Sequence, residues 1–559
     1  MDRPARMRVA TGIVLTLLVL VAAAPAVEAA GTGATGSSSE IAPAKKPPPA
    51  VTPSGDWPTY LHDPARTGDA PNETVLSPTT APLLTLHWKF TTGGMIASQP
   101  IVVNRTVFVG SYDGYEYALN VTTGAKIWSK NLGQSTALNC SASPRGIIST
   151  ATVANGVLYV GSGTQWYYAL NAANGSVIWK FDDGNTSKFF NWGSPLVEGG
   201  HLYLGRSSGC DAPLVRADLW EVNLTDHAVI QKYYVVPAGR HGGSIWGSPT
   251  YDAASNSIFF ATGNGEIVNE SGAKSIVAID ATALTLRGQW QIPYNQTGPD
   301  SDFGVTPTLA VGPNGAPIVV AANKNGVVYA LPRDNVSAGP VWKDQIAVGG
   351  QCPECGQGSV SSAAWDGSTV FVAGGKTSIA NTSYNGSVRA VDPTDGSYRW
   401  QFGAPGAVIP AVTYANGLVV AGAGSVLEIL NAATGSSVFS YTTGGPIYGA
   451  ASVANGCVFA SSTDMSVYAF GLPGTNCTAV PLASHPKPHP HAAPVSGAVS
   501  LPVAGAATSA RAPRGAPRHP LRPGESRRPN PARSGSEVFR RSMTVHPRER
   551  SRRDRGSRG

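Results

Sequence analysis

Cysteine residues are the first side chains whose spacing could support chemistry. The 559-residue chain has six, and two of them form the motif Cys352-Pro-Glu-Cys355. No histidine follows this motif, so it is not a haem-attachment sequence. Without a second cysteine pair it is also a weak zinc site. We therefore expect a local Cys352–Cys355 disulfide, and a second bridge between Cys457 and Cys477 in the last repeat.

The N-terminal residues predict export, which would favour such disulfides. Residues 1–30 combine an arginine-rich start, an apolar run from Val9 to about Ala24 and a small-residue cleavage site at 26–30. This pattern is typical of a signal peptide, the alternative being a signal anchor that stays uncut. Residues 31–54, rich in Gly, Ser, Ala and Pro, are expected to form a flexible linker. No other stretch approaches the roughly 20 apolar residues needed to span a bilayer, so we expect no transmembrane segment after cleavage.

Glycosylation signals agree with a secreted or otherwise extracytoplasmic location. The sequence contains thirteen Asn-x-Ser/Thr sequons, including those at Asn72, Asn269 and Asn476. This number favours a secreted glycoprotein. The alternative is a bacterial protein whose β-sheet surface is rich in Ser and Thr.

The net charge of +7 is unevenly distributed. Residues 511–559 hold fifteen arginines and four acidic residues, whereas residues 51–479 carry a net charge of −7. Residues 480–559, rich in Pro and Arg, lack apolar periodicity and are expected to be disordered. This basic tail would either bind an anionic surface or be simply solvated. Nucleic-acid binding would depend on the tail alone, so no nucleic-acid partner is expected.

A repeated pattern organises residues 55–479. Each unit has a Val-rich segment, a Gly turn, a second apolar segment, then Ala-Leu-Asn, Thr-Gly and an aromatic residue, as in NRTVFVGSYDGYEYALNVTTGAKIW ending at Trp128. Only 13% of residues are charged, and the chain has 65 Gly and 44 Pro, which favours short strands joined by tight turns. Four strands per repeat of 40–50 residues predict a β-propeller blade.

Eight such units begin near residues 96, 147, 190, 243, 303, 358, 407 and 445. The sequence therefore predicts an all-β, eight-bladed propeller, with the repeated tryptophans packing between blades. The last unit lacks its own terminal strand. We expect the segment ending at Trp88-Lys-Phe to supply that strand, which would close the ring and remove exposed edges.

The unit resembles the tryptophan-docking repeat of pyrroloquinoline-quinone (PQQ) dehydrogenases. The opening Asp56-Trp-Pro-Thr-Tyr-Leu-His-Asp63 is similar to the start of the polyvinyl-alcohol-dehydrogenase-like branch, and the resemblance covers about residues 55–475. It implies a quinoprotein site in the central funnel, holding PQQ beside Ca²⁺. Because structural propellers share this repeat, including the lipoprotein scaffold of outer-membrane barrel assembly, the site residues must be considered separately.

Four residues are implied to bind the cofactor. Arg145 matches the family's arginine that clamps a quinone carboxylate, a role that suits the forked guanidinium. Trp246 matches the floor on which the quinone stacks, Ser244 matches a cofactor-contacting hydroxyl, and Lys324 matches a basic residue at the quinone oxygens. Asn139 stands where the family has the first of two adjacent cysteines, so the vicinal disulfide cannot form. Cys140 could instead pair with Cys210.

Three further residues are implied to bind Ca²⁺ or to act as the base. Asn264 matches the family's amide ligand, and Asp302 matches the catalytic base beside the metal. Asp211 stands where the family has a Glu, and its shorter side chain changes the reach to the metal. The alternatives are a core tryptophan at Trp246, a turn residue at Asn264 and an Asx turn at Asp302.

Two functions follow from these residues. The first is an exported quinoprotein oxidoreductase that oxidises a small or polymeric alcohol with PQQ and Ca²⁺, with Asp302 as base. No Cys-x-x-Cys-His sequence is present, so electrons would pass to a separate acceptor such as a cytochrome or a quinone. The second is a non-catalytic propeller that acts as an extracellular binding or scaffold module. Convergence of Arg145, Asp211, Asn264 and Asp302 around Trp246 would distinguish the two.

Overall fold

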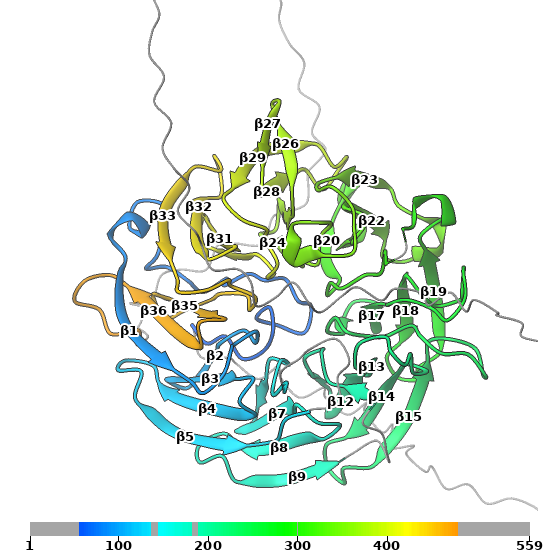
Figure 1. The fold of residues 1–559 in the computed structure, drawn as a ribbon, viewed down its shortest axis with the longest axis horizontal. Coiled ribbons are helices and arrows are strands. Elements are labelled where there is room, and N and C mark those ends of the chain that lie inside the picture. Colours follow the sequence, from blue (N-terminus) through cyan, green and yellow to red (C-terminus); the bar gives the residue numbers. More distant parts are fainter. Residues whose placement is uncertain (1–54, 136–143, 182–187, 299, 479–559) are drawn as a thin grey trace, which may run out of the picture. The chain divides into compact units, whose positions relative to one another are not determined.

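The computed structural model describes residues 55–135, 144–181, 188–298 and 300–478. Within these residues the fold is all-β, with eight four-stranded antiparallel sheets and only short 3-10 helices. The sheets follow one another in chain order around a common centre (Figure 1). The predicted eight-bladed propeller is confirmed.

Blades 1 to 4 each run from an inner strand to an outer strand in chain order. Blade 1 contains β2 (Ile101–Val103), β3 (Thr106–Gly110), β4 (Tyr115–Asn120) and β5 (Lys126–Asn131). Blade 2 contains β6 (Thr152–Ala154), β7 (Val157–Gly161), β8 (Tyr167–Asn171) and β9 (Val177–Phe181). Blade 3 contains β11 (Leu196–Glu198), β12 (His201–Gly205), β14 (Asp218–Asn223) and β15 (Val229–Tyr234). Blade 4 contains β16 (Thr250–Asp252), β17 (Ser257–Ala261), β18 (Ser275–Asp280) and β19 (Leu286–Gln291).

Blades 5 to 8 repeat this order, except that the outer strand of blade 8 comes from the N-terminal side. Blade 5 contains β20 (Thr308–Val311), β21 (Pro317–Ala322), β22 (Val327–Pro332) and β23 (Trp342–Gln345). Blade 6 contains β24 (Ala364–Trp365), β25 (Val370–Gly374), β28 (Gly386–Val391) and β29 (Tyr398–Ala404). Blade 7 contains β30 (Thr413–Ala415), β31 (Leu418–Ala423), β32 (Val426–Asn431) and β33 (Ser437–Thr442). Blade 8 contains β34 (Ser452–Ala454), β35 (Cys457–Ser462), β36 (Ser466–Gly471) and β1 (Thr85–Thr91).

Small elements lie between these strands. Two two-stranded sheets were not predicted from the repeat; they pair β10 (Phe189–Phe190) with β13 (Ser207–Ser208), and β26 (Thr377–Ile379) with β27 (Thr382–Tyr384). The 3-10 helices are η1 (Ala81–Leu83), η2 (Tyr294–Gln296), η3 (Pro313–Gly315), η4 (Val336–Ala338) and η5 (Pro353–Cys355). No helix among the described residues is long and apolar enough to cross a membrane.

The ring closes as the sequence predicts. β1 pairs antiparallel with β36, and Trp88 lies opposite Ala469. The Cys457–Cys477 disulfide ties the residues after β36 back to β35, and the Cys352–Cys355 disulfide is also present. Both disulfide predictions are therefore confirmed.

Outer-strand tryptophans join neighbouring blades. The indole N–H of Trp88 donates to the carbonyl of Val121 at 2.9 Å, and Trp128 donates to Ala172 at 3.0 Å in the same way. The Trp88 ring packs so closely on Gly124 that a Cβ there would lie 2.6 Å from the ring. Gly124 also has a φ of +69°, which other residues adopt at a cost. A glycine at this turn makes room for the tryptophan of the preceding blade at four positions, Gly124, Gly175, Gly396 and Gly435.

The segment before β1 runs across the inner strands of several blades. Trp57 exchanges backbone hydrogen bonds with Val102 in blade 1, and Ala70 donates to Tyr414 in blade 7. Arg66, fully buried, donates to the carbonyls of Pro195 and Pro249, which precede blades 3 and 4. This segment therefore links blades that are far apart in the sequence.

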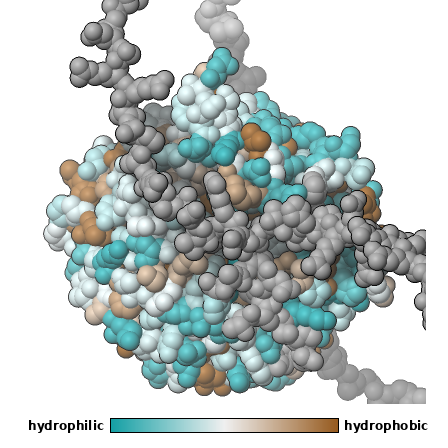
Figure 2. Space-filling model, viewed as in Figure 1, coloured by the Kyte–Doolittle hydropathy of each residue, from teal (hydrophilic) through white to brown (hydrophobic). Residues whose placement is uncertain are grey.

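Hydrophobic packing between the sheets forms the core. The central strands of the blades are almost entirely buried, whereas the outer strands consist mostly of exposed and partly buried residues. On the face seen in Figure 2, apolar residues form small separated groups among hydrophilic ones. Because buried apolar residues fill the central strands, polar residues that could bind a ligand are expected in the loops that connect the strands.

Candidate active site

The candidate residues lie in loops at one end of the blades. Asp211, Asn264 and Lys324 are in connections between the second and third strands of blades 3, 4 and 5. Trp246 and Asp302 are in the segments that enter the inner strands of blades 4 and 5. Because the strands are antiparallel, both kinds of connection lie at the same end of a blade. The repeat therefore brings residues from three blades to one edge.

Asn264 links two aspartates. Its Nδ2 atom donates to Asp211 Oδ2 at 3.0 Å and to Asp300 Oδ1 at 2.7 Å. Asp211 and Asn264 thus meet as the resemblance implied. The carboxylate that hydrogen-bonds to Asn264 is, however, Asp300 rather than Asp302.

Lys324 is the cation of this cluster. Its Nζ atom lies 3.0 Å from Asp300 Oδ2 and 2.8 Å from Asp302 Oδ1. It also lies 5.0 Å from the ring centroid of Trp246, within the range of a cation–π contact. We define the carboxylate cluster as Asp211, Asn264, Asp300, Asp302 and Lys324.

Burial and charge shift the pKa values of these groups in different directions. Burial raises the pKa of Asp302, and the nearby Asp300 carboxylate raises it further against the opposing effect of Lys324. Burial also acts to raise the pKa of Asp300, but Lys324 and the hydrogen bond from Asn264 hold it below its usual value. Burial raises the pKa of Asp211. The two carboxylates beside Lys324 therefore differ, and Asp302 is the one that binds a proton more readily.

Trp246 forms an apolar surface next to the carboxylate cluster. Gly304 lies against its ring, where a Cβ would be 2.1 Å from the ring edge. Trp192 stands at 73° to Trp246 with ring centroids 6.5 Å apart. The Arg145 guanidinium lies 5.2 Å from the Trp192 ring centroid. Arg145 thus contacts Trp192, which in turn packs edge-on against Trp246.

Ser244 has partners within the protein. Its Oγ accepts a hydrogen bond from the Ser208 backbone N–H at 3.0 Å and donates to Ser208 Oγ at 3.1 Å. Ser208 in turn lies three residues before Asp211. Ser244 therefore holds the loop that carries Asp211, in addition to the cofactor contact that the resemblance implied.

Several polar atoms of the site have no hydrogen-bond partner among the described residues. They include Arg145 Nε, Trp246 Nε1 and Asn264 Oδ1, all of them buried. Buried polar atoms normally find partners, so an unpaired set in one place indicates a missing ligand. Three carboxylates facing one ammonium also leave an excess of negative charge, which suits a cation.

Two site residues were missed by sequence reasoning. Asp300 stands two residues before the predicted Asp302, and its acidic side chain in the same short segment was the available signal. Trp192 lies in the segment between β10 and β11, and no feature of the repeat distinguishes it. Asn139 and Cys140 lie outside the described residues; Cys210 is disulfide-bonded.

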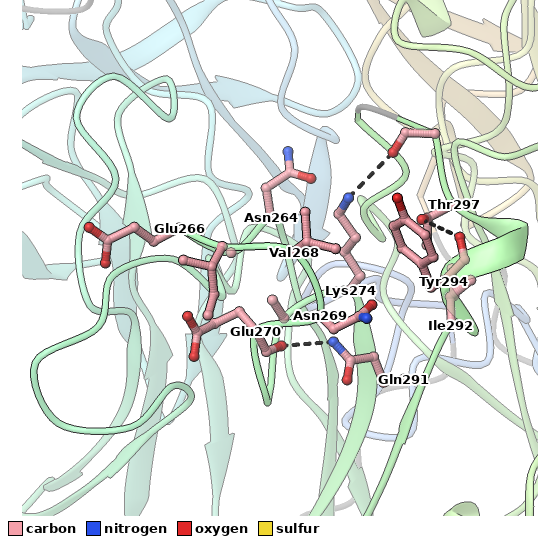
Figure 3. A pocket seen from close by; sticks show the side chains of 14 residues that line it. Asn264, Glu266, Val268, Asn269, Glu270, Lys274, Gln291, Ile292, Tyr294 and Thr297 are labelled. Carbon is pink, nitrogen blue, oxygen red and sulfur yellow. Dashed lines mark hydrogen bonds between the residues drawn. The ribbon is translucent and has the colours of Figure 1, made fainter.

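A cavity of about 460 Å³ opens beside Asn264. The loop 264–270 forms one side, and residues 291–298 form the other (Figure 3). Its volume is within the range of small-molecule sites. The cavity therefore adjoins the carboxylate cluster without containing Asp302.

The sequence is similar to those of known alcohol dehydrogenases. A polyvinylalcohol dehydrogenase from a Pseudomonas species is 27% identical over 396 residues, covering 61% of this chain and 60% of that protein. A second, from Sphingopyxis sp. (strain 113P3), is 26% identical over 424 residues, covering 65% and 63%. The quinohemoprotein alcohol dehydrogenase of Comamonas testosteroni is 25% identical over 331 residues, covering 50% and 45%. The chain is related to the quinoprotein alcohol dehydrogenases.

Matches to a family model and to solved structures agree on the fold. The family model described as outer membrane protein assembly factor BamB matches residues 85–154 and 384–476. The Comamonas testosteroni enzyme structure superposes with a TM-score of 0.64 at 18% identity, over 77% of this chain and 82% of that one. A europium-containing methanol dehydrogenase gives 0.61 at 17% identity, over 75% and 98%. The chain spans about three fifths of the two polyvinylalcohol dehydrogenases it matches.

Proposed function

We propose that the protein is an exported quinoprotein oxidoreductase that oxidises an alcohol with PQQ and Ca²⁺. One observation carries this proposal: Asp211, Asn264, Asp300, Asp302 and Lys324, from three different blades, meet beside Trp246. A propeller that only needs to be stable gains little from gathering three carboxylates near one lysine, with Asp302 buried among them. The similarity to polyvinylalcohol dehydrogenases supports a polymeric or small alcohol as substrate.

The residues present fit a planar, negatively charged quinone. Trp246 offers a flat ring, while Arg145 and Lys324 offer positive charge, and Arg145 Nε and Trp246 Nε1 are unpaired donors. When bound, PQQ would supply the acceptor for the hydride of the alcohol. Arg145 would hold a carboxylate of the quinone, and Trp246 would support its ring.

The donor set also fits a hard divalent cation. Asp211 Oδ2 and Asp300 Oδ1 converge on the amide of Asn264, whose Oδ1 is unpaired. The two ends of an asparagine amide can exchange by rotation, which would turn that oxygen toward the two carboxylates. Calcium prefers several oxygen ligands of this kind. Asp300 therefore joins Asp211 and Asn264 as a proposed ligand, beside the predicted Asp302.

Asp302 is the proposed base. Its Oδ1 lies 2.8 Å from the Lys324 ammonium, and the buried carboxylate would accept the proton of an alcohol hydroxyl. Burial keeps its proton affinity high, as a base working near neutral pH requires. Lys324 stabilises the carboxylate when the proton is absent, and the buried position of Asp302 excludes bulk water.

Reconstitution tests this function. The purified protein would be incubated with PQQ and Ca²⁺ and assayed with ethanol by reduction of an artificial dye. We expect dye reduction that needs both additions, and an Asp302→Asn variant that turns over roughly 10²- to 10⁴-fold more slowly. Asp392→Asn, an exposed change on blade 6, serves as the control. No retained PQQ and no dye reduction would contradict the proposal.

A binding or scaffold role is the second candidate. The match of residues 85–154 and 384–476 to the family model described as outer membrane protein assembly factor BamB favours it. Both matched segments lie outside blades 3 to 5, which hold the carboxylate cluster. A scaffold would lose nothing from Asp302→Asn in any binding assay, so the same variant separates the two functions.

A further inference from the structure

The cavity beside Asn264 is built into the same two loops that carry the carboxylate cluster. One wall begins at Asn264, and the other ends at Gly298, two residues before Asp300. Lys274, which lines the cavity, is near enough to Asp211 to lower its pKa. A molecule that reacts at Asp302 could therefore extend into this cavity.

Apolar side chains at the cavity are unusually exposed. Ile267, Val268 and Tyr294 are 46%, 68% and 63% exposed, and all three line this one cavity (Figure 3). Ile292 and Ala273 are buried in its wall. A cluster of exposed apolar groups around a concave surface is typical of a site that an apolar chain covers.

Polar groups alternate with these apolar ones. Gln291 Nε2 donates to the Glu270 carbonyl at 2.7 Å, and Lys274 Nζ lies 3.4 Å from the Gly298 carbonyl. Glu270 is buried, and its Oε2 lies 3.7 Å from Arg240 Nε. The charged lining residues are two glutamates and one lysine, which does not suit an anion. A neutral ligand with both carbon chain and hydroxyl groups fits this lining best.

We propose that this cavity is a substrate subsite for the neutral, hydroxyl-bearing aliphatic chain of a long alcohol. The chain would lie against Ile267, Val268 and Tyr294 while the reacting hydroxyl lies at Asp302. This inference rests on the proposed function, because it assigns the rest of the substrate. It also explains why the loop 264–270 keeps apolar side chains in contact with solvent.

Filling the cavity tests the subsite. Val268→Trp places a large side chain in the cavity from an exposed position. Val177→Trp, at a 40% exposed valine on blade 2, is the matched control. With the reconstituted protein, kcat/KM is measured for a short oligomer of vinyl alcohol and for ethanol. We expect the oligomer-to-ethanol ratio to fall at least about tenfold in Val268→Trp and to stay unchanged in Val177→Trp.

Binding without PQQ provides a second measurement. Calorimetric titration of the cofactor-free protein with the oligomer should show binding by the wild type and Val177→Trp, and none by Val268→Trp. Equal binding by both variants, or an unchanged ratio in Val268→Trp, would overturn the subsite even if ethanol is oxidised. Oligomer binding that Val268→Trp abolishes would support the subsite even if no alcohol is oxidised, in which case the proposed function alone fails.

Discussion

Two buried cations, Arg66 and Lys324, are satisfied in different ways. Arg66 donates four hydrogen bonds, to the carbonyls of Pro195, Pro249 and Tyr60 and to the Thr59 hydroxyl. Lys324 instead pairs with two carboxylates, and the amide oxygen of Asn264 beside them has no hydrogen-bond partner among the described residues. Where every polar group already has a hydrogen-bond partner, as around Arg66, no group is left to bind a ligand. Where some polar groups lack a partner, as around Lys324, a ligand can supply it. The contrast separates a structural site from a functional one.

Replacing Arg66 should lower the free energy of unfolding strongly. Arg66→Met leaves the carbonyls of Pro249 and Tyr60 without a donor. The Pro195 carbonyl keeps a hydrogen bond from the Thr152 hydroxyl. Each unpaired buried group costs about 1–3 kcal/mol, so we expect the free energy of unfolding to fall by at least about 2 kcal/mol, as measured by urea denaturation. Arg399→Met breaks an exposed ion pair with Asp392 and should change the free energy of unfolding by about 1 kcal/mol or less. Equal losses in both variants would contradict the structural role of Arg66.

The carboxylate cluster should respond to metal instead. Ca²⁺ at about a hundred times its dissociation constant would raise the free energy of unfolding by about 2.7 kcal/mol through binding to the folded state. Asp300→Asn removes a proposed ligand and should abolish most of this gain. Asp392→Asn, far along the chain on blade 6, should preserve it. Melting curves with Ca²⁺ and with chelator measure the difference, and a gain that survives Asp300→Asn would exclude Asp300 as a ligand.

The two centres also differ in how well the sequence predicts them. Repeat period, Thr-Gly turns and outer-strand tryptophans are local patterns, and they predict eight blades and the closure by β1. Asp211, Asn264 and Lys324 are predictable because each follows the second strand of a repeat that resembles a known family. The contacts of Arg66 join residues up to 183 positions apart, for which no local pattern exists.

The sequence also does not predict the direction in which loop side chains point. Asp300 and Asp302 belong to one short segment, and their residue types do not show which carboxylate meets Asn264. The backbone of the loop decides this, together with the position of Lys324 in a separate loop of blade 5. Trp192 and the cavity beside Asn264 likewise depend on how non-repeating loops fold, so the blades are more predictable than the site between them.

Glu116 provides a stricter test of the rule that unpaired polar groups indicate a ligand. It is fully buried in β4, and neither carboxylate oxygen has a hydrogen-bond partner among the described residues. Burial alone raises the pKa of Glu116 well above 4.5, with no charged neighbour contributing. We expect a protonated acid in an apolar contact between blades, and no ligand.

The pH dependence follows from that raised pKa. Below the unfolded-state pKa, near 4.5, the folded protein keeps the full contribution of protonated Glu116; as pH rises toward the folded-state pKa, that contribution is lost. The free energy of unfolding should fall as the pH rises above about 4.5, by up to about 1.4 kcal/mol per pH unit. Glu116→Gln removes this slope in urea denaturation at a series of pH values in this range. A slope that remains would mean that Glu116 is already paired or ionised.

Two tryptophans also differ in whether the indole N–H has a hydrogen-bond partner, and the expected difference in stability is the smallest of those considered. Trp88 Nε1 is hydrogen-bonded to Val121, whereas Trp246 Nε1 is buried without a partner. Trp88→Phe should therefore lose about 1 kcal/mol from that hydrogen bond, in addition to lost packing between blades 8 and 1. Trp246→Phe loses no such bond, and it removes an unpaired donor, so it should reduce stability less than Trp88→Phe does. If PQQ retention falls in Trp246→Phe while Trp88→Phe keeps it, the unpaired indole belongs to the binding site; the reverse result would assign Trp246 to the core.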